Sequence, residues 1–323
     1  MTIRPSVVAV LVLLVIAWQT PVQGSKPDRR RNYQQVERTM AAAPRVMVSV
    51  CVVSGDLTVR GWDRNEVRAR ATDGTQIELS RSDQMKSQAA TELRVTRSGN
   101  RRTGPNPSCI QSGDLELDVP RGAGIKLETS SGDIRVTEVA RVEASSQSGS
   151  MTVDKLLGEV SLNTISGEIS VRASGGTFKL HSVSGRVEAR NLIPTGLGGD
   201  FAASTVSGEV ILDHVQIPTI KVNTVSGDMD WTGPLARAGR YNLQSISGRI
   251  RLALASDASF RLSASLGRTV KFSSDFNLHY SDNQNTAGVW NHGGFRLIDG
   301  TNGSADSLIT VSLLEGSLQI SKR

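Results

Sequence analysis

A Ser-Gly motif, followed by a polar and then an apolar residue, occurs seven times between residues 126 and 252. The steps between consecutive glycines are 17, 18, 18, 23, 19 and 21 residues. A nearly constant step indicates one supersecondary unit that is copied along an axis. The glycines of the motif are Gly132, Gly149, Gly167, Gly185, Gly208, Gly227 and Gly248.

Apolar residues alternate with polar ones on both sides of each of these glycines. With the glycine as position 0, positions −5, +2 and +4 are apolar, and position −3 is always Thr or Ser. Alternation with period two predicts two short strands joined by a turn, in which Gly adopts backbone angles closed to other residues. The residues at −3 are expected to stack as a hydroxyl ladder that hydrogen-bonds along the axis.

The length of the repeat selects the fold class. A βαβ unit needs about 30 residues, and no segment has helical spacing. The sequence therefore predicts an all-β chain, a β-solenoid with coils of about 18–20 residues. Equivalent strands of successive coils would pair in parallel about 4.8 Å apart. Regular coils are expected over 113–252, within a solenoid domain of 45–322 whose amino-terminal coils are irregular. A two-layer β sandwich is the alternative, but it does not require the same Ser-Gly at every step.

Residues 1–24 have the features of a secretory signal peptide. Arg4 is their only charge, and residues 7–18 form a 12-residue apolar run that is too short for a comfortable membrane span. We therefore expect an exported protein, with no transmembrane span after cleavage. An uncleaved membrane anchor is the alternative.

The net charge of +6 is concentrated near the amino terminus. A basic polar leader is expected over residues 25–44, and residues 25–45 hold six basic and two acidic residues, a net charge of +4. Subtracting this and Arg4 from +6 leaves about +1 for the rest of the chain. Nucleic-acid binding requires a clustered basic surface on a folded domain, so no nucleic-acid partner is predicted.

The two cysteines occupy the same place in two repeats. Cys51 and Cys109 both lie four residues before a glycine of the motif, at Gly55 and Gly113. Equivalent positions in adjacent coils would be about 4.8 Å apart, within the Cα spacing of a disulfide. Because exported chains meet an oxidising compartment, a Cys51–Cys109 disulfide is predicted. The alternative is two separate buried thiols.

The period loosens after residue 252, and the segment 253–322 is expected to form an aromatic-rich carboxy-terminal cap. Solenoids require such caps at their open ends. Binding clefts also combine aromatic and polar groups, so Tyr280, Trp290 and His292 are the candidate ligand contacts. A degenerate last repeat surrounds Gly316. Six of the 13 aromatic residues lie in this segment, namely Phe260, Phe272, Phe276, Tyr280, Trp290 and Phe295.

No motif of a known catalytic, cofactor or metal site is found in the sequence. It contains no HExxH, no CxxC, no Walker A loop and no GxSxG elbow, so no catalytic, cofactor-binding or metal-binding residue is predicted. Acidic residues do recur at position +1, either as a solvated turn edge or as a ladder that binds Ca²⁺ or glycan hydroxyls. Arg186 and Arg249 interrupt this row, so neighbouring charges are expected to pair. The acids are Asp114, Asp133, Glu168, Glu209 and Asp228.

The repeated Ser-Gly-Asp/Glu-Ile/Val motif resembles the putative-adhesin domain of bacterial envelope proteins. The opening segment 55–63, the segment 115–120 and the glycine-rich segment 299–303 agree with it, so the resemblance covers roughly residues 45–322. It implies a β-solenoid, a location in the periplasm or on the cell surface of a bacterium, and an adhesive or scaffolding role with a glycan or protein partner. It supplies no catalytic residue.

Two other functions stay open at this point. A carbohydrate-active β-helix enzyme, a lyase or hydrolase, would need converging carboxylates, about 5–9 Å apart in a hydrolase. An envelope-stress regulatory or sensory module would instead dock a partner by a sheet face or an edge strand. The oligomeric state is not predicted.

Overall fold

Each repeat folds as a longer strand, a glycine turn and a shorter strand. In the computed structural model, Leu127 before Gly132 and Ile134 after it are buried, whereas their neighbours Glu128 and Arg135 are exposed. This inward and outward alternation follows directly from the two-residue period of a strand.

The structure describes residues 35–83, 89–99, 109–195, 198–280, 289–290 and 294–323. Within these residues it contains strands and no helix, so no described helix is long and apolar enough to cross a membrane. The strands are β1 (Val36–Ser54), β2 (Leu57–Trp62), β3 (Glu66–Ala71), β4 (Ile77–Arg81), β5 (Ala90–Arg97), β6 (Leu115–Pro120), β7 (Gly124–Ser131), β8 (Ile134–Thr137), β9 (Arg141–Ser148), β10 (Met151–Asp154), β11 (Leu157–Ser166), β12 (Ile169–Arg172), β13 (Gly175–Ser184), β14 (Val187–Arg190), β15 (Asp200–Ser207), β16 (Val210–Asp213), β17 (Thr219–Ser226), β18 (Met229–Thr232), β19 (Arg240–Leu254), β20 (Phe260–Gly267), β21 (Lys271–Ser274), β22 (His279–Tyr280), β23 (Val289–Trp290), β24 (Phe295–Asn302) and β25 (Leu308–Lys322).

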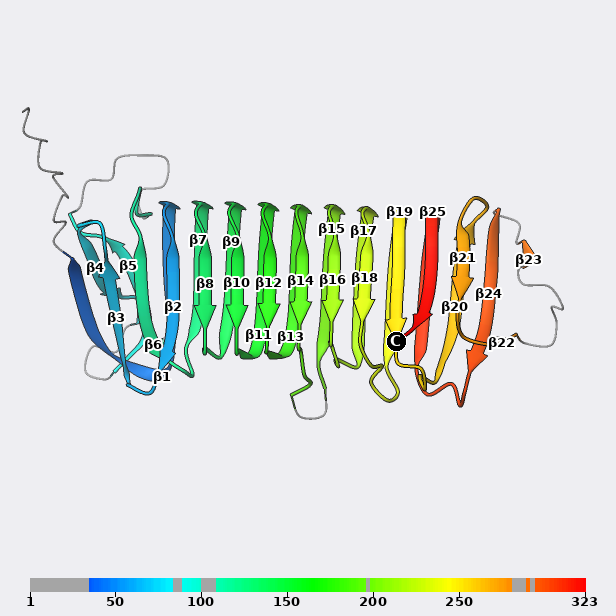
Figure 1. Cartoon of the computed structure of the whole chain (residues 1–323). Coiled ribbons are helices and arrows are strands. Elements are labelled where there is room, and N and C mark those ends of the chain that lie inside the picture. The colour runs from blue at the N-terminus through cyan, green and yellow to red at the C-terminus, as the bar shows by residue number, and fades with distance from the viewer. Residues whose placement is uncertain (1–34, 84–88, 100–108, 196–197, 281–288, 291–293) are drawn as a thin grey trace, which may run out of the picture. The chain divides into compact units, whose positions relative to one another are not determined.

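The repeats stack as parallel coils in constant register (Figure 1). The longer strands pair in the order β7, β9, β11, β13, β15, β17 and β19, and the shorter ones in the order β8, β10, β12, β14, β16, β18 and β19. Thr129, Ser146 and Thr164, for example, are direct partners across three coils. The predicted all-β solenoid is therefore confirmed.

The order of the coils along the axis differs from their order along the chain at both ends. β1 and β2 lie between the coil of β7 and β8 on one side and strands β5 and β6 on the other. Likewise, β25 lies between β19 and strands β20 and β21. Residues 308–322 thus form the degenerate repeat around Gly316, but this repeat is not the outermost layer of the stack.

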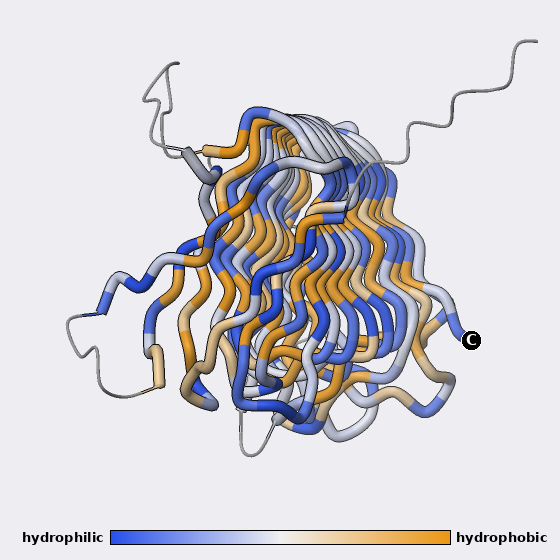
Figure 2. Tube along the Cα trace, turned by 90° about the vertical axis from the view of Figure 1, so that its left-hand side faces the viewer, coloured by the Kyte–Doolittle hydropathy of each residue, from blue (hydrophilic) through white to orange (hydrophobic). Residues whose placement is uncertain are grey.

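The core is a continuous column of apolar residues inside the coils, and Figure 2 shows hydrophobic positions that line up from coil to coil. It contains Phe178 and Phe201 on adjacent coils, with ring centroids 6.2 Å apart. In the carboxy-terminal segment, Phe260 and Phe276 are buried and pack edge to face at 5.2 Å. These two aromatic residues therefore continue the core into the segment that the sequence predicted to form a cap.

The glycine turns also stack, and their contact explains why the residue does not vary. A Cβ added to Gly132 would lie 2.1 Å from the carbonyl oxygen of Gly55 in the neighbouring coil, and one added to Gly149 would lie 2.2 Å from that of Gly132. Both glycines have positive φ, +123° and +116°. Any side chain here would meet both a backbone clash and a strained conformation.

Candidate interaction surface

The aspartates at position +1 accept backbone hydrogen bonds from neighbouring coils. Asp56 receives the backbone N–H of Asp133 at 2.9 Å, and Asp133 receives that of Ser150 at 3.0 Å. Each carboxylate thus satisfies a turn N–H of the next coil.

The two arginines that interrupt this row are paired with acids of adjacent coils. Arg186 contacts Glu209 at 2.9 Å, and Arg249 binds Asp228. Neighbouring charges therefore pair, as the sequence indicated, and the row is not a continuous acidic ladder. No group of three or more His, Cys, Asp or Glu residues within the described ranges could hold a metal ion.

Two ion pairs, one in this row and one between β20 and β24, shift the pKa of their carboxylates. Burial alone would raise the pKa of Asp228, but hydrogen bonds from the guanidinium and backbone N–H of Arg249 outweigh it and hold the pKa below its usual range. A hydrogen bond from Arg261 lowers the pKa of Asp299 in the same way. Both carboxylates are thus ionised at neutral pH, in ion pairs that link adjacent strands.

The hydroxyl row at position −3 is buried and in register, but its hydrogen bonds do not run along the axis. Thr129 and Ser146 each donate to the carbonyl of the residue two positions later, at 3.0 and 2.8 Å. Thr164, Ser182 and Thr205 have no hydrogen-bond partner in the described structure. The expected axial hydroxyl ladder is therefore wrong, because each hydroxyl turns toward its own strand or stays unpaired.

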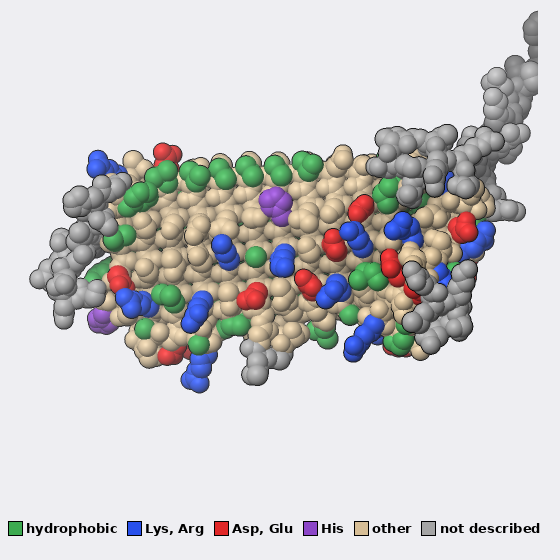
Figure 3. All heavy atoms as spheres, turned by 180° about the vertical axis from the view of Figure 1, so that it is seen from behind, with side chains coloured by type: hydrophobic (Ala, Val, Ile, Leu, Met, Phe, Trp, Pro, Cys, Tyr) green, Lys and Arg blue, Asp and Glu red, His purple; other side chains and the backbone are tan. Residues whose placement is uncertain are grey.

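The longer strands present a flat outer face. On it, the side chains at position −2 of successive coils form one row, and those at position −4 form another. Position −2 carries an aliphatic side chain in six consecutive coils, each 38–56% exposed. Figure 3 shows a row of hydrophobic side chains along one edge of such a face. We call this row the aliphatic ridge, and it consists of Ile165, Val183, Val206, Val225, Ile246 and Leu314.

A second row runs beside the ridge at position −4 and contains no Lys, Arg, Asp or Glu. His181 and Ser204, in adjacent coils of this row, are joined by a hydrogen bond of 2.7 Å between Nδ1 and Oγ. We call it the polar row, and it consists of Asn163, His181, Ser204, Asn223, Gln244 and Ser312.

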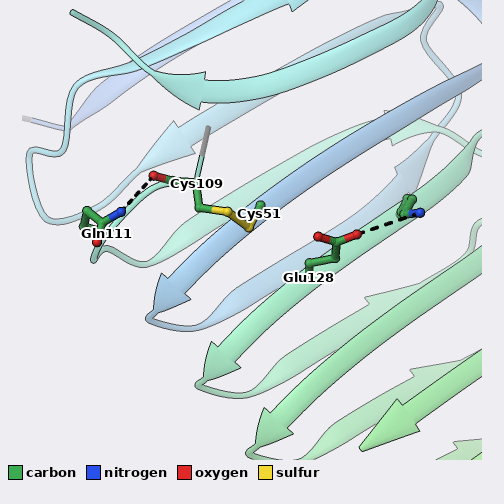
Figure 4. Close-up of a disulfide and its surroundings, with 5 residues drawn as sticks. Cys51, Cys109, Gln111 and Glu128 are labelled. Carbon is green, nitrogen blue, oxygen red and sulfur yellow. Dashed lines mark hydrogen bonds and ion pairs between the residues drawn. A yellow bond between two sulfur atoms is a disulfide. The ribbon is translucent and has the colours of Figure 1, made fainter. Parts of the chain in front are cut away.

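At the amino-terminal end of the same face, a groove of about 540 Å³ lies over β1. The Cys51–Cys109 disulfide lines it, with the two Cα atoms 4.7 Å apart. Figure 4 shows Gln111 donating to the carbonyl of Cys109 beside this bond, and Glu128 on the next coil. Lys126 pairs with Glu128 at 3.8 Å, and Glu92 and Arg94 also line the groove. The groove is thus lined by charged groups of both signs together with apolar side chains such as Met47 and Val95.

The aromatic ligand contacts predicted at the carboxy-terminal end are only partly described. Tyr280 is 40% exposed on β22 and pairs with Gly300 of β24. The backbone of Trp290 pairs with Arg296, but the Trp290 side chain and the whole of His292 lie outside the described residues. A binding role for these three residues stays a prediction.

The aliphatic ridge was missed in the sequence, although a signal for it was present. Position −2 reads Ile, Val, Val, Val and Ile in five successive repeats. The residue at −2 points away from its inward neighbour at −3, so an apolar residue there is exposed. Leu314 could not be added from the sequence, because only the structure places its coil next to that of Ile246.

Comparisons with known proteins give one family and one solved structure. The model of a family described as Toastrack DUF4097 matches residues 63–321. A crystal structure of a putative cell adhesion protein from Clostridium sporogenes is 8% identical, with 90% of this chain and 100% of that chain covered and a TM-score of 0.29. This score is too low to support an argument. No curated protein matches the chain.

Proposed function

The chain belongs to the Toastrack DUF4097 family, and we propose that it is an exported, non-enzymatic interaction or scaffolding protein of the bacterial cell envelope. The observation that carries this proposal is the aliphatic ridge. Exposed apolar residues are usually scattered singly on soluble proteins, whereas a contiguous row marks an interaction surface. Here six of them lie in line on one flat face.

Two features support a location outside the cytoplasm. The Cys51–Cys109 disulfide is of a kind that persists in oxidising compartments. Residues 1–24 have the charge and the apolar run of a signal peptide. Fractionation of the producing cell, followed by sequencing of the mature amino terminus, tests this part of the proposal. A cytoplasmic protein that begins at Met1 would contradict it.

Binding to the envelope is the direct test of the function. Purified protein is mixed with isolated cell envelopes, and the bound fraction is measured after sedimentation. We expect saturable binding that falls at least fivefold when Val206→Lys and Val225→Lys are combined. Ile193→Lys changes an exposed aliphatic residue away from the ridge and serves as the matched control. Equal binding by all three proteins would show that the ridge is not the contact surface.

A screen of polysaccharides distinguishes this function from a carbohydrate-active enzyme. The +1 carboxylates are the obvious candidates for such chemistry, so Glu209→Gln and Asp228→Asn are compared with the wild type. We expect no turnover with any of the three. Turnover that disappears in either carboxylate variant would replace the binding proposal by an enzymatic one.

A further inference from the structure

We propose that the aliphatic ridge docks against the ridge of a second copy of this chain, with the two solenoid axes antiparallel. This rests on the proposed function, because it names the partner of the same face. A two-fold axis between the third and fourth coils of the ridge would set Val206 against Val225, Val183 against Ile246 and Ile165 against Leu314.

The spacing of the ridge favours this partner. Its side chains repeat at the strand separation of a sheet, about 4.8 Å. A surface that interdigitates with all six side chains must repeat at the same interval, as paired sheets do in dry zipper interfaces. A second copy of this chain meets that requirement because it carries an identical ridge.

Side-chain stiffness favours it as well. Five of the six ridge residues are Val or Ile, whose χ1 angles are already restricted before binding. Ordering them in an interface therefore loses less entropy than ordering long flexible side chains would.

The distribution of charge around the ridge also favours a second copy of this chain as the partner. In an antiparallel pair related by this two-fold axis, ridge meets ridge and polar row meets polar row. The polar row consists of amide, hydroxyl and imidazole groups, so no pair of like charges is buried. Position −1 beside the ridge is Ser in five of the six coils. The outer face of the shorter strands, in contrast, carries ion pairs such as Arg251–Asp230.

The size of the surface predicts that the dimer is weak. Six coils at about 4.8 Å, and two rows about 7 Å apart, span on the order of 400 Å² per copy. A standard stable interface buries about 800 Å² per partner. The association should therefore be reversible, and it would become strong only where many copies are held together on a surface.

Sedimentation equilibrium of the full exported chain tests the proposal. We expect the wild type to show a monomer–dimer equilibrium at protein concentrations below about 1 mM. For Val206→Lys combined with Val225→Lys, the Kd should be at least tenfold higher. In Val206→Lys combined with Val225→Glu, each new lysine faces a glutamate of the other copy, so dimerisation should return. Ile193→Lys should leave the Kd unchanged. Circular dichroism of each variant verifies that the solenoid is intact.

Cysteine cross-linking tests the orientation. With both Ile165→Cys and Leu314→Cys in one chain, oxidation should give a covalent dimer on a non-reducing gel. Ile165→Cys alone should not, because the two copies of residue 165 would be five coils, about 24 Å, apart. Efficient cross-linking of the single variant would overturn the antiparallel arrangement.

Two further results would overturn self-association. A wild-type chain that stays monomeric to about 1 mM would do so. If such a monomer still binds envelopes through the ridge, the proposed function stands and only the identity of the partner is wrong. Dimerisation that is unaffected by the ridge variants would likewise reject this surface as the contact.

Discussion

The buried hydroxyl groups at position −3 are of two kinds. Some donate a hydrogen bond to their own strand, and the others have no partner in the described structure. Thr129 donates to the carbonyl of Ser131 at 3.0 Å, whereas Thr164, two coils away, is 2% exposed and has no partner in the described structure. A buried polar group without a partner destabilises a protein, and a paired one contributes modestly. Removing the hydroxyl group is therefore expected to have opposite effects on stability at these two threonines.

Replacing these threonines by valine, which has nearly the same shape, tests this difference. Thr164→Val should raise the free energy of unfolding by about 1 kcal/mol, because it removes an unpaired hydroxyl. Thr129→Val should lower it by about 1 kcal/mol, because it removes a hydrogen bond. Urea unfolding of both variants checks the prediction, and equal effects of one sign would contradict it.

A glycine of the stacked turns should tolerate no side chain. Gly132→Ala places a Cβ 2.1 Å from the carbonyl oxygen of Gly55 at a φ of +123°. Backbone strain and overpacking together should lower the free energy of unfolding by about 3 kcal/mol or more. Gly198→Ala is the control, because a Cβ there meets no heavy atom within 4 Å. Thermal unfolding of the two variants should differ clearly.

At the scale of the element, the ion pair between Asp228 and Arg249 joins the turns of two adjacent coils. Arg249 also donates its backbone N–H to Asp228 at 2.9 Å. The folded pKa of Asp228 lies below the unfolded value of about 3.9. Its stabilising contribution is therefore complete above the unfolded pKa and is lost as the pH falls through the folded pKa.

Asp228→Asn should accordingly be less stable than the wild type at pH 7, and this difference should shrink below about pH 4. Arg249→Met, which removes the partner, should show the same pH dependence. Guanidinium chloride unfolding at pH 7 and at pH 3 measures both variants. A difference from the wild type that does not change with pH would assign the effect to something other than the carboxylate charge.

For the whole molecule, the internal coils are interchangeable and the end layers are not. Each internal coil contacts its two neighbours through the same register, so removing one should leave a shorter solenoid. Deletion of residues 150–167 joins Gly149 directly to Glu168 and should preserve a cooperative thermal transition. Deletion of residues 308–323 removes β25, which pairs with β19, β20 and β21, and should abolish that transition. Loss of cooperativity in both deletions would argue against independent coils.

The disulfide should also affect the stability of the whole molecule. Cys51 and Cys109 are 58 residues apart, and they join the coil of β1 and β2 to the layer outside it. Closing a loop of that length should stabilise the fold by about 4 kcal/mol. Unfolding with and without reductant, compared with the double variant Cys51→Ser and Cys109→Ser, measures this contribution. Rapid alkylation of both thiols in the folded exported protein would show that the bond does not form there.

The sequence by itself determined the repeating unit, the parallel stacking, the glycine turns and the equivalence of Cys51 and Cys109, because each depends on local alternation and on a constant period. It did not determine the order of the layers at either end. β1 and β25 lie inside the end layers, although chain order would place them at the ends of the stack, and only pairing between distant strands decides this. The tertiary structure also decided which hydroxyl groups are paired, and it brought Leu314 into line with five residues from consecutive coils. A binding surface of this kind arises from the register between coils, and register is a property of the folded stack.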